Sequence, residues 1–221
     1  MIQNERLRKL EAEGQQLSLS YPNLSLKLNP NGTGSVTGQI EVADGISYSA
    51  LLHIPTSYPD REPVLYCDAK EIPWKLRRHV YENSNGVACL CGRCETRVHW
   101  PKGSDLTNFV TKLVHPYFVC QFYYDAYGKW PPTGERSHGK LGILETFVDL
   151  LTEIRNPSEN QIKGFLRLLA RKNNPKGHEK CPCGSGKNLR LCHEKLIAHL
   201  RSCIDPRHAL LDLKEAFGFA K

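Results

Sequence analysis

The chain has 221 residues, of which 40% are hydrophobic and 24% are charged, and its formal net charge at pH 7 is +7. This length accommodates one medium-sized domain with a small appendage, and the apolar content is sufficient for a core. No apolar run reaches the roughly eighteen residues that a membrane-spanning helix needs, so we expect no membrane partner. Residues 1–5 are polar and do not begin a signal peptide, so we expect a cytoplasmic protein.

The first element in chain order is a charged helix, predicted at 3–14 from the spacing of its leucines. Short runs with strand character follow, separated by Asn31-Gly32 and Asp44-Gly45, which are typical of hairpin turns. We expect these strands at 24–28, 35–42, 47–54 and 64–67. Together they predict a four-stranded antiparallel meander entered by a helix, and a loop-rich stretch is expected at 68–104.

The second half of the chain is predicted to be helical. A helix is expected at 105–119 with Ser104 as its N-cap, and another apolar run spans 141–154. Asn156-Pro157-Ser158 begins a linker or a cap. Shorter helices are then expected at 161–171, 194–203 and 206–217. The fold class is therefore α+β.

Nine cysteines in a reducing compartment are more typical of metal ligands, a nucleophile or core residues than of a disulfide set. Three of them lie with a histidine within thirteen residues: Cys181, Cys183, Cys192 and His193. Zinc prefers four such ligands in a tetrahedron, and Pro182 and two glycines allow the required sharp turns. Four protein ligands close the site, so the predicted zinc is structural. His178 and His199 flank the cluster, and either is an alternative ligand.

The run Cys181-Pro182-Cys183-Gly184-Ser185-Gly186-Lys187, followed by Cys192-His193, resembles the SEC-C motif. This motif is a small zinc module that occurs as an addition to other domains. The resemblance implies a metal and an accessory module at 178–221. Because it covers only a small part of the chain, it does not imply an activity.

The order of helix, meander, cysteine-bearing loop and helix resembles the ubiquitin-conjugating (UBC-like) fold. Tyr58-Pro59 and Glu62-Pro63-Val64 resemble the family segment that enters the fourth strand. The stretch 79–90 resembles the His-Pro-Asn…Gly-x-x-Cys-Leu signature, with ten positions from His79 to Cys89. Trp100-Pro101 resembles the Trp-x-Pro that follows the family cysteine, after a slightly longer gap. The resemblance covers residues 1–150 and implies a UBC-like domain, joined by a helical linker at 151–177 to the zinc module.

The resemblance implies that Cys89 carries a ubiquitin-like modifier, or another protein C-terminus, as a thioester and transfers it to a lysine. The implied partners are a ThiF-like activating enzyme, the modifier and a protein target with an acceptor lysine. By analogy with family members, the setting is a bacterial conjugation or antiphage pathway. The alternative for Cys89 is a buried core cysteine.

This chain departs from the family pattern at Tyr81, which stands where the family has the asparagine that steadies the active-site loop. Bacterial members also lack this asparagine and often carry a histidine after the cysteine. The glycine-flanked loop 130–139 resembles that element. His138 is accordingly the candidate that polarises the thioester carbonyl or deprotonates the lysine. The alternative for His138 is a structural hydrogen bond.

Cys91 and Cys94 form a C-x-x-C pair close to Cys89. They are candidates for a second metal site, with His99 as a further ligand, for a redox-sensitive pair, or for incidental cysteines.

Three function hypotheses follow from the sequence. The first is a conjugating enzyme with Cys89 as nucleophile, and the second is a non-catalytic UBC-like adaptor that recruits partners through its zinc tail. The third is a nucleic-acid or ribosome-associated zinc protein, suggested only by the basic stretch 155–207. Few aromatic residues interleave with that stretch, so nucleic acid is the least expected partner. Thioester trapping separates the first two hypotheses, and salt-dependent binding to nucleic acid tests the third.

Overall fold

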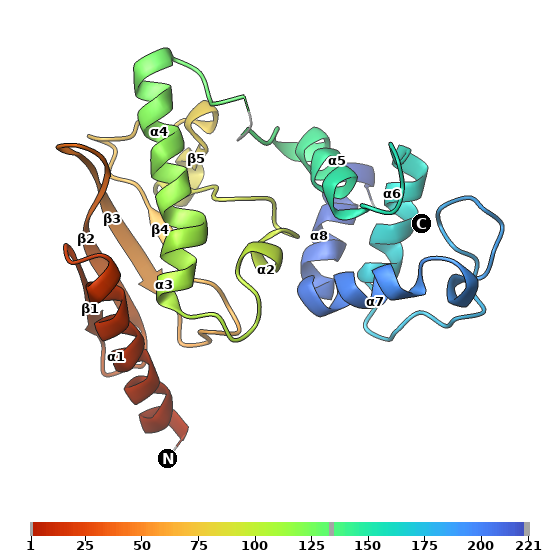
Figure 1. Ribbon diagram of the computed structural model, residues 1–221, viewed down its shortest axis with the longest axis horizontal. Coiled ribbons are helices and arrows are strands. Elements are labelled where there is room, and N and C mark those ends of the chain that lie inside the picture. The colour runs from red at the N-terminus through yellow and green to blue at the C-terminus, as the bar shows by residue number, and fades with distance from the viewer. Residues whose placement is uncertain (1, 133–134, 219–221) are drawn as a thin grey trace. The chain divides into compact units, whose positions relative to one another are not determined.

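The computed structural model describes residues 2–132 and 135–218, with side chains from Glu5 onward (Figure 1). The fold is α+β, with one antiparallel sheet and several helices. The chain divides into two compact units, residues 1–90 with 102–135 and residues 91–101 with 136–221. The boundaries expected at 150 and 177 stay predictions. No described helix combines the length and the apolarity needed to cross a membrane.

The sheet of the first unit contains the predicted meander and two further strands. The meander consists of β1 (Leu24–Leu28), β2 (Gly34–Ala43), β3 (Ile46–Ile54) and β4 (Val64–Tyr66), and the short strands are β5 (Val80–Tyr81) and β6 (Val87–Ala88). The strand order is β1-β2-β3-β4-β6-β5, with antiparallel neighbours throughout. Strands β5 and β6 lie in the stretch 68–104, which was expected to be loop-rich and for which no strand was predicted. Two-residue strands are too short to show the alternation from which strands are predicted.

Helix α1 (Ile2–Ser20) runs beyond the predicted end at residue 14 and packs against β1. Gly14 permits the close approach, because a Cβ at this position would lie 2.5 Å from Leu26 Cδ2. Leu17, one turn further on, is fully buried and explains why the helix continues. Arg6 ties the helix to neighbouring loops by donating to the carbonyl oxygens of Gly32, Pro55 and Tyr58 at 2.7, 2.9 and 3.0 Å.

The helix expected at 105–119 exists but is longer and irregular. It comprises α3 (Leu106–Phe109), a π-helical turn (Val110–Val114) and α4 (His115–Tyr127). Its N-cap is Asp105 and not Ser104, because the Asp105 carboxylate accepts from the backbone N–H of Asn108 at 2.7 Å. Phe118 stacks on Tyr48 of β3, with ring centroids 5.4 Å apart, so α4 covers one face of the sheet (Figure 1).

The second unit is helical and contains α2 (Thr96–His99), α5 (Gly139–Leu150), α6 (Glu159–Leu169), α7 (Glu194–Cys203) and α8 (Pro206–Phe217). The tail helices α7 and α8 have the predicted bounds. Ser158 is the N-cap of α6 and forms a capping box with Gln161. Helices α5 and α6 both pack against α8. Short 3-10 turns complete the fold at Leu76–Arg78, Glu82–Ser84 and Leu189–Leu191.

The segment 91–101 belongs to the second unit, although it begins only two residues after Cys89. Cys94 is buried in the core of this unit. Arg93 forms ion pairs with Asp212 and Glu215 of α8. Burial raises the pKa of Asp212, while the Cys94 thiol and the Arg93 guanidinium oppose that rise. The ion pair therefore compensates part of the cost of a buried carboxylate and anchors this segment to α8.

Candidate functional site

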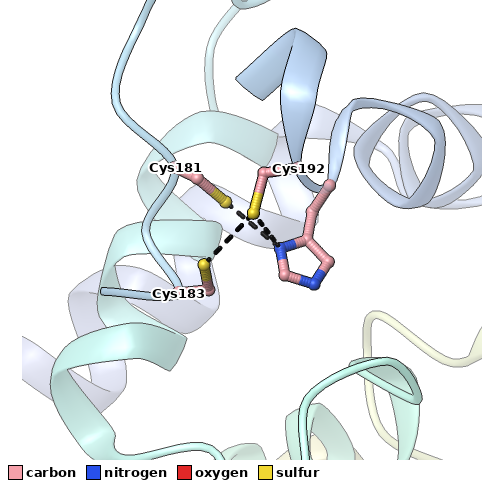
Figure 2. A group of neighbouring side chains, drawn as sticks. Cys181, Cys183 and Cys192 are labelled. Atoms are coloured by element: carbon pink, nitrogen blue, oxygen red, sulfur yellow. Dashed lines mark hydrogen bonds between the residues drawn. The ribbon is translucent and has the colours of Figure 1, made fainter. Parts of the chain in front are cut away.

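The four residues expected to bind zinc lie together in the second unit (Figure 2). The Sγ atoms of Cys183 and Cys192 are 3.5 Å apart. His193 Nδ1 lies 3.2 Å from Cys181 Sγ and 3.2 Å from Cys192 Sγ. All four ligand atoms lie within 4.8 Å of one another. The structure thus gathers Cys181, Cys183, Cys192 and His193 around one point.

The size of this cluster fits a zinc ion. Zinc–sulfur and zinc–nitrogen bonds of about 2.3 and 2.0 Å give a tetrahedron with S–S edges of about 3.8 Å and S–N edges of about 3.5 Å. The distances of 3.5 and 3.2 Å are slightly shorter but on the same scale. Three thiol sulfurs and one imidazole nitrogen are also a donor set that zinc prefers. His178 and His199 are exposed and lie outside this group of described side chains.

The local sequence explains how the cluster forms. Residues 180–188 make a tight hairpin, closed by the Cys181 N–H, which donates to Lys187 O at 2.9 Å. Gly184 and Gly186 have φ values of 83° and 73°, a left-handed region that favours glycine. The following 3-10 turn leads to Cys192, and His193 is the N-cap residue of α7.

The thiols of the cluster differ in their tendency to ionise. Burial raises the pKa of Cys181 to about 12. Burial also acts to raise the pKa of Cys183, but hydrogen bonds with the side chain and backbone of Ser185 outweigh it and lower the pKa to about 6. Zinc binds thiolates, so metal binding at this cluster is expected to release protons.

The cluster is built into the core of the second unit. Cys181 is buried in the same core as Phe165 of α6. Pro182 lies over Gly164, where an added Cβ would be 2.7 Å from Pro182 Cβ. Gln161 Nε2 donates to Cys183 O at 2.6 Å. Sequence reasoning did not identify Gln161 or Gly164 as supports, because nothing near either residue in the sequence signals a contact with the cluster.

His193 has two further neighbours. Its Nε2 atom lies 3.9 Å from Glu153 Oε2, and its ring meets Phe165 edge-on at 6.1 Å. A carboxylate facing the second ring nitrogen of a metal-binding histidine helps to set the orientation of the ring. Glu153 is therefore a further residue of the site that the sequence pattern did not indicate.

Cys89 lies in the first unit, directly after β6. Its backbone N–H donates to His79 O at 2.7 Å. His79 and Asn85 adopt left-handed φ values of 52° and 53°, and Gly86 has a φ of 82°. Gly86 also lies against Trp74, where a Cβ would be 2.4 Å from Cε2. The Cys89 side chain is half-buried, which is intermediate between the exposed nucleophile and the buried core cysteine considered from the sequence.

His138 is the N-cap residue of α5, in the second unit. The preceding Ser137 is held by Glu145, which accepts from Ser137 N and Oγ, both at 2.8 Å. Gly142 permits this turn, because a Cβ there would lie 1.7 Å from Ser137 O. Residues 133–134 of the predicted loop lie outside the described residues. Cys89 and His138 belong to different units, so their joint role stays a prediction.

The remaining expectations concern the C-x-x-C pair and Tyr81. Cys91 Sγ lies 3.7 Å from Thr96 Oγ1, and burial together with Asp212 raises the pKa of Cys94. Within the described part of the chain, no metal-competent group includes Cys91, Cys94 and His99 together. Tyr81 is in β5 and is 40% exposed.

A comparison with protein families identifies the hairpin. Residues 179–195 match the SEC-C motif. The matched segment contains all four cluster residues, and the SEC-C motif is a zinc-binding module. Comparisons with curated proteins and with solved structures returned no match. The motif covers a small part of the chain, and nothing in the comparisons supports the resemblance to the UBC-like fold, which stays an expectation.

Proposed function

We propose that the SEC-C segment holds one structural zinc ion through Cys181, Cys183, Cys192 and His193. The convergence of these four ligand atoms within 4.8 Å supports this proposal. The ion would cross-link the hairpin to the start of α7. The residues around it, Gln161 and Gly164 of α6, orient the hairpin whichever metal is bound.

We further propose that the chain is a UBC-like acyl carrier with Cys89 as its nucleophile. The observation that carries this proposal is the Cys89 backbone, held by His79 O beside a helix-entered antiparallel meander. In the reaction, the Cys89 thiolate attacks the thioester carbonyl of a modifier bound to an activating enzyme, and the thiolate of that enzyme leaves. A lysine amine of the target then attacks the Cys89 thioester, Cys89 leaves as a thiolate, and the lysine nitrogen loses a proton to a base.

Six of the eight other cysteines are less suited to be the nucleophile than Cys89. Burial raises the pKa of Cys67 to about 11 and also raises the pKa values of Cys94 and Cys120, which disfavours the thiolate that must attack. Cys181, Cys183 and Cys192 are committed to the metal cluster. The half-buried Cys89 follows a left-handed turn, in a segment whose spacing resembles the family signature.

In this proposal His138 is the base or the carbonyl-polarising group during transfer to lysine. The partners are a ThiF-like activating enzyme, a ubiquitin-like modifier and a protein target with an acceptor lysine. A bacterial conjugation or antiphage pathway is the proposed setting, by analogy.

The experiment is thioester trapping with the cognate activating enzyme, ATP and modifier. Wild type should form an adduct that a thiol reductant cleaves, and Cys89→Ala should form none, because the acyl-accepting sulfur is gone. Cys91→Ala and Cys94→Ala are the matched controls and should still load. Loading of Cys89→Ala at the wild-type rate would refute the proposal.

A second candidate is a non-catalytic adaptor that recruits a partner through its SEC-C segment. Tyr81 favours it, because this exposed side chain stands where the family signature has the asparagine that steadies the active-site loop. The activating enzyme and the modifier are first shown to be active by loading a second conjugating protein. If wild type then forms no adduct with them, the result supports the adaptor over the enzyme.

A further inference from the structure

The turn at Arg78 and His79, to which the Cys89 backbone is hydrogen-bonded, is held by one buried side chain of α4, that of Gln121. Gln121 is fully buried. Its Nε2 donates to Arg78 O at 2.7 Å, and its Oε1 accepts from Arg78 Nε at 2.7 Å. One amide therefore fixes both the backbone and the side chain of a single residue, 43 positions away in the sequence.

The Arg78 carbonyl, which accepts from Gln121, belongs to the peptide that joins Arg78 to His79. His79 has a φ of 52°, a region that is unfavourable for a residue with a Cβ and that persists only where its surroundings enforce it. The next carbonyl along the chain, that of His79, accepts the Cys89 N–H at 2.7 Å. Two hydrogen bonds and the backbone of His79 thus connect Gln121 to the backbone of Cys89.

Other contacts strengthen the same turn, and one of them reaches the same carbonyl oxygen. Tyr117 Oη donates to Arg78 O at the longer distance of 3.2 Å. Arg78 Nη1 pairs with Asp125 Oδ1 at 2.5 Å, and its guanidinium lies 4.4 Å from the centre of the Tyr124 ring. Trp130 Nε1 donates to Arg77 O at 2.8 Å. Asp125, Tyr124 and Trp130 hold the Arg78 side chain and the Arg77 carbonyl, whereas Gln121 makes a shorter hydrogen bond to Arg78 O than Tyr117 does.

We propose that Gln121 is a positioning residue for Cys89, acting through the Arg78–His79 peptide. It does not touch the reacting sulfur. It sets the backbone from which that sulfur is presented, so its loss loosens Cys89 before the rest of the unit opens. The expected effect of Gln121 on the loading of Cys89 rests on the proposed thioester function. Its effect on the order of the Cys89 backbone does not.

The structural test is amide hydrogen exchange of the full chain labelled with ¹⁵N-cysteine. The Cys89 N–H reports the bond to His79 O, and the Cys67 N–H, which donates to Gly86 O at 2.9 Å, serves as the internal reference. In Gln121→Met the Cys89 amide should exchange about 10- to 100-fold faster relative to Cys67, because two buried hydrogen bonds are lost.

Two further variants separate a specific effect from general destabilisation. Val36→Ala opens a cavity in β2, away from the turn, and should accelerate both amides by the same factor. Gln121→Glu keeps the acceptor for Arg78 Nε but loses the donor to Arg78 O, so it should loosen Cys89 selectively. If Cys67 and Cys89 accelerate equally in both Gln121 variants, the proposal is overturned.

The functional test uses the same variants in the loading assay. Gln121→Glu should load Cys89 about 10-fold more slowly than Val36→Ala, once both are corrected for their folded fractions. Equal corrected rates would refute the positioning role. A wild type that never forms a thioester counts against the proposed function alone, because the exchange experiment needs no activating enzyme.

Discussion

Cys183→Ser is the most informative single change for testing the proposed metal centre. Cys183 is a half-buried member of the cluster, so serine at this position removes a ligand without opening a large cavity in the core. Its sulfur lies 3.5 Å from Cys192 Sγ and is one of the four candidate ligand atoms that lie within 4.8 Å of one another. A change in stability should therefore report the loss of metal more than the loss of packing.

The expected magnitude follows from the ligand count. Structural zinc sites contribute about 10–16 kcal/mol of apparent binding free energy, so one ligand of four corresponds to about 3 kcal/mol. That loss weakens zinc binding by more than about 100-fold. For a unit of this size, 3 kcal/mol lowers the midpoint of thermal unfolding by about 12–24 °C.

The effect should extend through the second unit, because Cys181, Phe165 and the helices α5 to α8 share one core. Zinc content after dialysis against a chelator gives the first readout, and calorimetry of the full chain gives the second. Cys203→Ser is the matched control: it changes a half-buried cysteine of α7 that lies outside the cluster, and it should keep its zinc. Unchanged zinc content in both Cys181→Ser and Cys183→Ser would refute the assignment.

Two more predictions concern a histidine and a cap. His138→Ala should slow transfer from Cys89 to lysine about 100-fold and affect loading less. Single-turnover discharge measures this, with His208→Ala as control, and rates equal to wild type would leave His138 a structural role. At the N-cap of α8, a hydrogen bond with Arg207 lowers the pKa of Asp205 to about 2. Because the pKa of Asp205 is lower in the folded than in the unfolded state, the ionised carboxylate stabilises the fold. This contribution to the free energy of unfolding is complete above about pH 4 and is lost as the pH falls towards 2. Thermal unfolding between pH 5 and pH 2 should show this loss in wild type but not in Asp205→Asn, and parallel curves would contradict it.

Local sequence signals predicted those parts of the structure that depend on neighbouring residues. Asn31-Gly32 and Asp44-Gly45 form the turns between the first three strands, because glycine adopts the positive φ values of 84° and 71° found there. The spacing of the cysteines and His193 predicted their convergence, since a hairpin with two glycines brings residues this close in the chain together.

The spacing of apolar residues over several helical turns predicted the helices correctly but placed some of their ends one or more residues away from those observed. Helix α1 continues to Ser20 because Leu17 is buried, and the cap at Asp105 replaces the one expected at Ser104. In both cases a tertiary contact or a single hydrogen bond decides the boundary, and neither is visible in the periodicity.

The sequence by itself thus determined the meander, the tail helices and the cysteine–histidine cluster. Only the tertiary structure decided three other contacts. Gln121 binds the Arg78 carbonyl in the turn to which Cys89 is hydrogen-bonded, Gln161 binds the hairpin of the cysteine–histidine cluster, and Arg93 pairs with Asp212. These partners lie 43, 22 and 119 positions apart. Turn and ligand signals act through residues that are close in the chain, where spacing alone restricts the geometry. A buried hydrogen bond or ion pair joins whichever distant side chains the packing of helices and sheet brings together, so no local pattern encodes it.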